Sequence, residues 1–330
     1  MTESKRKSAN PLLAGWLAAA VAAAAPIGAL AQVYPNKPVR LLVGFTGGST
    51  SDVIGRVVAQ KLGESLGQTV IVENRPGAGA NIAAEVVAKA APDGYTALYA
   101  NTGIAVAISA YAKLGYDVLR DLAPVGQAAA SPHILVVSLS LPVQSVKELI
   151  AFVKAKPREL NVASTGSGNS DHFAYELFRS MTGAEMTHIV YKGGPQAMID
   201  VMSGQVAAYF AGMAVALPLA RAGKTRALAV TSGQRSRIAP DIPTMVEAGL
   251  PGYEHLLWNA IFVPAATPKD IIARLDAELV KAVNSPDVRE RFAALGAEPA
   301  GRTSEQMAAY LKSEIDKYGK IVRAIGLKID

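Results

Sequence analysis

The sequence predicts an α/β protein with two lobes and a ligand cleft between them, and three observations support this prediction. The chain has 330 residues, of which 50% are apolar and 18% charged, so it is long enough for two domains with a substantial core. Strands followed by glycine-rich turns and helices recur in both halves of the chain, an order typical of parallel strands joined by crossover helices. The last two predicted helices lack such turns, and we expect them to return to the first lobe and make it discontinuous.

Residues 1–31 have the pattern of a signal peptide. Basic residues at 5–7 precede an apolar, alanine-rich stretch over 12–30, and Ala31 ends a small-x-small sequence that suits cleavage. We therefore expect the chain to be exported. An uncleaved membrane anchor is the alternative, because the stretch is about long enough to span a bilayer, although Pro26 and the alanines disfavour it.

Strands, glycine-rich turns and helices are expected to alternate in the first lobe. The predicted elements are a strand at 39–43, a glycine-rich turn at 45–52, a helix through 54–66, a strand at 70–72, a second turn at 74–81, an alanine-rich helix through 86–87, a tight turn at 92–94 and a strand at 96–99. The helices are predicted from apolar residues at helical spacing. A glycine-rich turn lets the backbone approach a ligand closely, and the helix behind it directs unpaired N–H groups there.

The second half repeats this order, and the final stretch departs from it. The predicted elements are a strand at 134–137, a capping box at 145–148 with its helix, a third glycine-rich turn at 164–172, a strand at 189–191, a fourth turn at 191–195, and strands at 207–210, 227–230 and 260–263. Thr267 is predicted to cap a long amphipathic helix with Pro268 at its first position, and Thr303 to cap a final one. We therefore assign residues 34–132 plus 257–330 to lobe 1, and residues 133–256 to lobe 2.

Composition and spacing exclude several classes of site. The formal net charge is +6, but lysines and arginines form no stripe interleaved with aromatic residues, so we expect no nucleic-acid partner. Cysteine is absent, which removes disulfides, thiol nucleophiles and thiolate metal ligands. The four histidines are scattered without ligand spacing, and we expect no metal site.

Nucleotide and hydrolase chemistry are also poorly supported. The segments 77–82 and 166–171 each carry two glycines of a dinucleotide fingerprint but lack the third. No Walker motif and no Gly-x-Ser-x-Gly elbow is present, so we expect no cofactor and no enzyme. Ser167, Ser170, Asp171 and His172 are neighbours in sequence, an arrangement that rarely forms a catalytic triad; hydrolysis of a small acid or ester is the less favoured alternative.

The turns together predict a site for a small anion. Their hydroxyls, amides and helix N-termini can hold a carboxylate without burying a formal countercharge, which suits reversible capture. Three side chains leave alternatives open: His172 either donates to a ligand carboxylate or orients its turn, Asp52 either caps its helix or holds a ligand group, and Lys192 either steers anions or is solvated.

Seven segments carry a resemblance to a known family. They are Tyr-Pro-Asn-Lys-Pro-Val-Arg at 34–40, Val-Glu-Asn-Arg-Pro-Gly-Ala-Gly at 72–79, Pro-Asp-Gly-Tyr-Thr at 92–96, His-Ile-Val-Tyr-Lys-Gly at 188–193, and the segments 227–232, 240–244 and 247–253. With them the chain resembles the Bug family, the periplasmic solute-binding proteins of tripartite tricarboxylate transporters. The resemblance implies a type II periplasmic binding fold, a periplasmic location, a monomer, and a small mono- or dicarboxylate held by main-chain amides, hydroxyls and ordered waters.

The resemblance also implies partners and site residues. The membrane subunits of a tripartite transporter are the expected partner, and a ligand-sensing component with the same cleft is the alternative. Asn101 and Thr102 are expected in the site as neutral donors, and the resemblance adds the turns. The expected ligand-binding residues are Phe45, Thr46, Gly48, Ser49, Thr50, Asp52, Gly79, Ala80, Asn101, Thr102, Ser164, Thr165, Gly166, Asn169, His172, Lys192, Gly193 and Gly194. The family usually has Pro-Phe-Pro-Pro-Gly-Gly in the first turn, whereas this chain has Gly-Phe-Thr-Gly-Gly-Ser at 44–49, which adds two hydroxyls and flexibility.

Overall fold

The computed structural model describes residue 2 and residues 34–329, and the segment Lys37–Asp330 is one compact unit, distinct from Met1–Asn36. Apart from residue 2, the predicted signal peptide at 1–31 lies outside the described residues. Among the helices that the structure does describe, none combines the length and the apolar character that a membrane crossing needs.

Ten strands form the sheet of this unit, in the order β2-β1-β3-β9-β4-β7-β5-β6, with β8 and β10 also paired to β4. The strands are β1 (Val39–Val43), β2 (Val70–Asn74), β3 (Thr96–Asn101), β4 (Leu122–Val137), β5 (Asn161–Ser164), β6 (Thr187–Val190), β7 (Ala208–Gly212), β8 (Arg226–Val230), β9 (Leu256–Pro264) and β10 (Glu298–Arg302). The predicted parallel pairing is confirmed for β1 with β2 and β3, and for β5 with β6 and β7.

Strand β4 belongs to two regions of the sheet. Its first part, 122–132, pairs with β9, whereas its last part, 133–137, pairs with β7 and β8. The sequence predicted only a strand at 134–137, because prolines and a glycine interrupt the earlier pattern. The structure accommodates Pro124 and Gly126 at a bulge in the β9 pairing, where the lost ladder hydrogen bond is tolerated.

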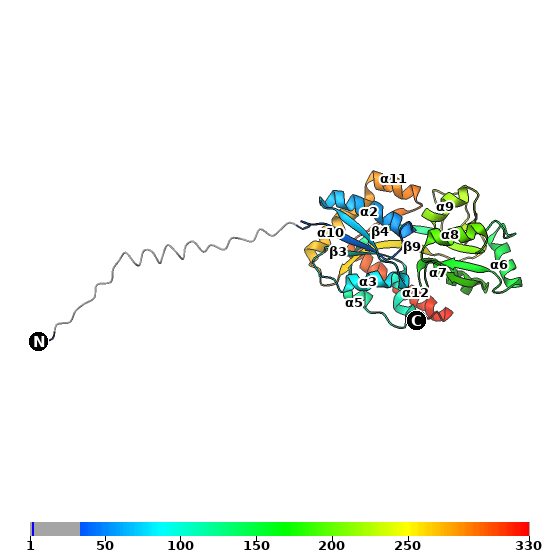
Figure 1. The fold of residues 1–330 in the computed structure, drawn as a ribbon, viewed down its shortest axis with the longest axis horizontal. Coiled ribbons are helices and arrows are strands. Elements are labelled where there is room, and N and C mark those ends of the chain that lie inside the picture. Colours follow the sequence, from blue (N-terminus) through cyan, green and yellow to red (C-terminus); the bar gives the residue numbers. More distant parts are fainter. Residues whose placement is uncertain (1, 3–33, 330) are drawn as a thin grey trace. The chain divides into compact units, whose positions relative to one another are not determined.

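Helices cover both regions of the sheet. They are α2 (Thr50–Leu66), α3 (Asn81–Ala88), α4 (Gly103–Ala110), α5 (Val118–Asp121), α6 (Val146–Ala155), α7 (Ser170–Thr182), α8 (Gly194–Ser203), α9 (Met213–Arg221), α10 (Lys269–Asn284), α11 (Pro286–Ala294) and α12 (Ser304–Ile325), with a short 3₁₀ turn η1 (Ala78–Ala80). Helices α2, α3 and α10 lie around the first region, and α6 to α9 around the second (Figure 1). Helices α10 and α12 return to pack on α2 and α4 respectively.

Most predicted helix starts have the expected caps. The Thr303 side chain and the Gln306 side chain form a reciprocal capping box at the start of α12, as predicted. The prediction at α10 is wrong by one residue: Pro268 is the N-cap, with an extended ψ of 140°, so the helix begins at Lys269 and the Thr267 hydroxyl has no hydrogen-bond partner among the described residues.

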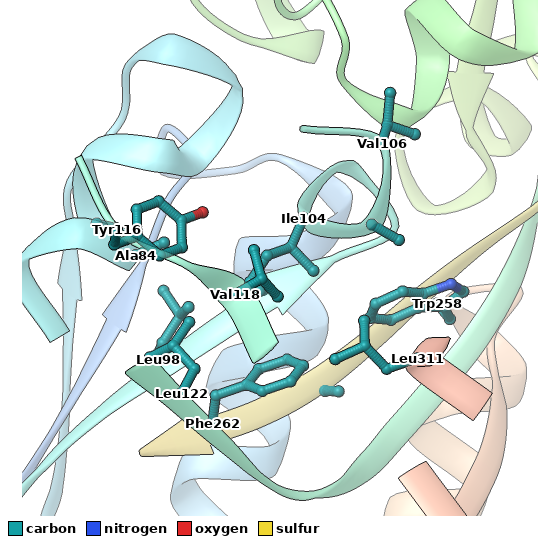
Figure 2. Close-up of a cluster of buried hydrophobic side chains, with 14 of the residues drawn as sticks. Ala84, Leu98, Ile104, Val106, Tyr116, Val118, Leu122, Trp258, Phe262 and Leu311 are labelled. Carbon is teal, nitrogen blue, oxygen red and sulfur yellow. The ribbon is translucent and has the colours of Figure 1, made fainter. Parts of the chain in front are cut away.

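The core of the first sheet region joins distant parts of the chain. Leu98 of β3, Phe262 of β9 and Leu311 of α12 belong to one buried cluster with Ile104 of α4 (Figure 2). Trp258 of β9 is fully buried and donates from Nε1 to Glu314 Oε2 at 2.9 Å. The last helix is therefore held against the sheet by packing and by a charge-assisted hydrogen bond.

Candidate ligand-binding site

Two cavities lie where the glycine-rich turns of the two halves meet. The inner cavity has a volume of about 40 Å³ and the outer cavity about 560 Å³. Both are lined by Phe45, Ser49, Thr165 and Asn169. The outer volume is in the usual range for small-molecule sites, and the inner volume is enough for a few water molecules or for one small polar group.

Four helices begin at the inner cavity, one of them α9 with its N-cap Gly212. Thr50 and Ser51 open α2, Asp171 is in the first turn of α7, and Gly194 opens α8; all four residues line the cavity. The first N–H groups of a helix have no acceptor within the helix, and its N-terminus carries a partial positive charge. This convergence makes the cavity favourable for an anion without a buried lysine or arginine.

Side chains around the inner cavity hold one another in place. Asn101 Nδ2 lies 3.3 Å from Asn169 Oδ1 and 3.4 Å from Ser51 Oγ, and its Oδ1 accepts from the Gly103 amide. Asn169 Nδ2 donates to Thr165 Oγ1 at 2.7 Å. Residues of both halves therefore share one hydrogen-bond network, which fixes the amide groups before any ligand binds.

Asp171 is the carboxylate among the residues that line the inner cavity. Its Oδ2 accepts from the Thr165 amide, the Thr165 hydroxyl and the Tyr209 hydroxyl at 2.8 to 3.0 Å, and its Oδ1 accepts from the His172 amide. Burial raises the pKa of Asp171, and these hydrogen bonds counteract part of that effect. Asp171 therefore orients Thr165 and Tyr209 toward itself.

Two threonines make close contacts with glycines across the site. A Cβ atom added at Gly193 would lie 2.0 Å from Thr46 Oγ1, and one added at Gly212 would lie 2.2 Å from Thr50 Oγ1. Real Cβ contacts are essentially never shorter than 3.0 Å, so a larger residue at either position would require the threonine or its turn to move. The Thr46 hydroxyl is buried and has no hydrogen-bond partner among the described residues.

The structure brings most of the predicted ligand-binding residues to one of the two cavities. Those that line a cavity are Phe45, Thr46, Ser49, Thr50, Gly79, Ala80, Asn101, Thr165, Gly166, Asn169, Lys192, Gly193 and Gly194. Gly48, Asp52, Thr102, Ser164 and His172 line neither cavity. Contact of any predicted site residue with a ligand stays a prediction.

The predicted residues away from the cavities support the turns. Asp52 accepts from the Gly48 amide at 2.9 Å and forms an ion pair with Arg56; burial would raise the pKa of Asp52, but the hydrogen bonds from Arg56, Asn74 and Gly48 outweigh it and lower the pKa. His172 Nδ1 accepts from the Gly168 amide at 3.0 Å.

The side chains of Thr102 and Ser164 also form hydrogen bonds within the protein. Thr102 Oγ1 donates to the Leu256 carbonyl and accepts from the Trp258 amide, both at 3.0 Å, which ties the end of β3 to β9. Ser164 Oγ contacts His188 Nε2 and accepts from the Gly166 amide. Both therefore position the backbone that carries the site.

Several lining residues were not among the predicted site residues. Tyr209, His133 and Leu257 line the inner cavity, and Tyr111 and Ile329 line the outer one. His133 is 2% exposed, and burial lowers its pKa to about 3. Tyr209 lies near the end of a predicted strand, a position from which it could have been suggested, whereas Tyr111 and Ile329 carry no local signal.

Comparison with known proteins agrees with this architecture. Residues 54–327 match the family described as "Tripartite tricarboxylate transporter family receptor". The chain is 39% identical to Protein BugT of Bordetella pertussis over 308 residues, which is 93% of this chain and 94% of that protein.

Two solved structures share the fold over almost their whole length. The R. palustris protein Rpa4515, solved with adipate, has a TM-score of 0.86 and 36% identity, with 89% of this chain and 99% of that chain covered. MatC of Rhodopseudomonas palustris, solved with bound malate, has a TM-score of 0.83 and 31% identity, with 88% and 100% covered. The two-lobed α/β fold predicted from the sequence is therefore confirmed, and the chain belongs to the tripartite tricarboxylate transporter receptor family of periplasmic solute-binding proteins.

Proposed function

We propose that this protein binds a small organic carboxylate in the periplasm and delivers it to the membrane subunits of a tripartite tricarboxylate-type transporter. The observation that carries the proposal is the convergence of the N-termini of α2, α7 and α8 on the inner cavity. The helix dipoles, and the first N–H groups that the caps Ser49 and Asn169 leave unpaired, would stabilise a carboxylate by charge-assisted hydrogen bonds. The adipate and malate in the two solved relatives support this ligand class.

Binding is proposed to close two lobes around the carboxylate. Lobe 1 comprises residues 34–132 plus 257–330 and lobe 2 comprises residues 133–256, so that β4 and the start of β9 connect them. The turns before α2 would supply one wall, and the turns before α7 and α8 the other. The predicted signal peptide supports export, and we expect the mature protein to act as a monomer.

A catalytic function is not proposed. Ser170 Oγ lies 2.9 Å from His255 Nε2, an arrangement that resembles a nucleophile and its base. The other ring nitrogen of His255, however, faces the Tyr318 hydroxyl at 3.3 Å instead of a carboxylate, and burial lowers the pKa of His255 well below its usual range. The imidazolium that a general base must form would therefore be poorly stabilised.

Calorimetric titration with a panel of aliphatic, hydroxylated and aromatic carboxylates tests the proposal. The titration should give one molecule bound per chain with no product formed, and in a thermal-shift assay a ligand at about 100 times its dissociation constant should stabilise the protein by about 2.7 kcal/mol. No binding across the panel would refute carboxylate recognition. Turnover of a bound acid or ester that is lost in Ser170→Ala would instead identify a hydrolase.

The partner requires a separate measurement. Uptake of the labelled ligand into vesicles that contain the membrane subunits should depend on this protein. Binding without any dependence of uptake would leave a sensing role as the better explanation.

A further inference from the structure

The outer cavity differs in chemistry from the inner one. Its walls carry the rings of Phe45, Tyr111 and Tyr191 and the aliphatic side chains of Val190 and Ile329. One proline and the alanines and glycines of the turns complete most of the remaining surface. Apart from the tyrosines, the polar side chains that line the outer cavity but not the inner one are those of Thr46, Ser167 and Lys192.

The tyrosine hydroxyls of the outer cavity are already engaged. Tyr191 donates to Asp200 Oδ2 at 2.6 Å, and Tyr111 donates to the Ser167 carbonyl at 3.0 Å. Both rings are therefore oriented by groups of the protein, and the hydroxyls have no proton left to donate to a ligand. A hydroxylated ligand body would therefore receive no hydrogen bond from these two tyrosines, and it would depend on the few polar side chains of the cavity to replace its hydrogen bonds to water.

One wall of the cavity comes from the segment that follows α12. The Ile329 amide donates to the Ala110 carbonyl at 2.8 Å, and the Ile329 carbonyl accepts from the Ala112 amide at 3.1 Å, so the backbone of Ile329 is fixed beside Tyr111. Its side chain reaches the turn before α7, where a Cβ at Gly168 would lie 2.5 Å from Ile329 Cδ1. An apolar surface thus closes this side of the cavity.

Val190 at the end of β6 provides a second apolar surface. Its side chain is 54% exposed although it is a large aliphatic residue that lines the cavity. A ligand that covered this side chain with its own hydrocarbon would remove apolar area from water. The cavity is also large, at about 560 Å³, so it can accept a ligand longer than four or five carbons.

We propose that the outer cavity receives a hydrocarbon body of about five carbons or more, so that the protein selects long aliphatic or aromatic carboxylic acids over short hydroxylated di- and tricarboxylates. The inference rests on the proposed function, because the inner cavity must hold the carboxylate while the outer cavity holds the body. Ile329, Tyr111 and Val190 are then specificity-determining residues.

Titration of a homologous series tests this selectivity. Affinity should rise about fourfold for each methylene from acetate to hexanoate, and 3-phenylpropanoate should bind more tightly than malate or citrate. Val190→Ala and Ile329→Ala should weaken hexanoate binding by about tenfold and leave acetate binding within about twofold. Ile199→Ala is the matched control, since Ile199 is 59% exposed on α8 and lines neither cavity.

The outcomes separate this inference from the proposed function. Malate or citrate binding more tightly than hexanoate and 3-phenylpropanoate would overturn the selectivity and leave carboxylate capture intact. An equal loss for acetate and hexanoate in Val190→Ala, whose exposed position keeps the fold unaffected, would also overturn it. Failure of every acid to bind would overturn both.

Discussion

Substitution of Gly193 by alanine should keep the two walls of the site apart. Gly193 precedes α8 with φ at −172°, an extended conformation that alanine adopts without strain. The added Cβ would lie 2.0 Å from Thr46 Oγ1 and 3.1 Å from Thr46 Cβ. Because the shorter contact is at least 1 Å below the 3.0 Å limit for real Cβ atoms, the turns must separate or Thr46 must rotate.

The size of the effect follows from the cost of an overpacked contact. Inserting one carbon into a close-packed site typically costs about 1–3 kcal/mol, which corresponds to about a 5- to 150-fold weaker affinity. The contact is present without a ligand, so part of this cost should lower the melting temperature of the unliganded variant. The rest should fall on ligand binding, which requires the two turns to stay together.

Calorimetric titration with the carboxylic acid that binds most tightly in the panel measures this loss of affinity. Gly47→Ala is the control, because Gly47 lies in the same first turn and a Cβ there meets no atom within 4 Å. The double variant Thr46→Ala/Gly193→Ala should regain part of the affinity, since the hydroxyl that clashes is gone. Unchanged affinity in Gly193→Ala, or an equal loss in Gly47→Ala, would refute the argument.

Three further predictions concern contacts and stability. Tyr111→Phe removes the hydrogen bond to the Ser167 carbonyl but keeps the ring, and it should weaken ligand binding by about fivefold in calorimetry; no change would show that the bond does not support the bound state. Phe262→Ala empties a fully buried site in the core of Figure 2 and should cost about 3–5 kcal/mol in urea denaturation; a loss below 1 kcal/mol would contradict the packing described. Acid should destabilise the protein through His133, whose folded pKa of about 3 lies below the unfolded value of about 6.5. Since the unfolded chain binds the extra proton, His133 alone should lower the stability by about 2 kcal/mol between pH 7.5 and 5; burial lowers the pKa of His188 and His255 as well. His133→Gln should therefore make the pH dependence in urea denaturation shallower by that amount, and an equally steep dependence in the variant would exclude a contribution from His133.

The parts of the fold that depend on local sequence were predictable. The starts of α2, α7 and α8 follow glycine-rich turns with Ser49, Asn169 and Gly193 as N-caps. Such turns leave a limited choice of backbone conformation, and strand, turn and helix follow one another within a few residues. The backbone part of the candidate site was therefore accessible from the sequence.

The parts that depend on tertiary pairing were not predictable. Tyr111 and Ile329 meet through a parallel β-bridge between two segments far apart in sequence. Neither segment has a periodic pattern or a motif that specifies this pairing. The first part of β4 was missed for a related reason, since Pro124 and Gly126 are disfavoured in strands and are tolerated there only because of the bulge opposite β9.

The roles of the Asp52 and His172 side chains could be predicted from the sequence only in part, for a different reason. The residue types and their places at helix starts were correctly identified, but which atoms they contact depends on Arg56 and Gly168. A carboxylate or an imidazole next to a glycine-rich turn can form hydrogen bonds either with a ligand or with the backbone of the turn itself. In the structure both side chains bind their own turns, and their contact with a ligand stays a prediction.

The pairing of β4 with β9 has a consequence for how the chain folds. Leu122 pairs with Pro264 and Pro132 with Leu256, so the central ladder of the sheet cannot form until most of the polypeptide is available. Contacts of such high sequence separation slow folding, because loop closure must precede the stabilising interactions. We therefore expect a long-lived unfolded state after synthesis, a property compatible with passage of the extended chain through a secretion channel before the strands meet.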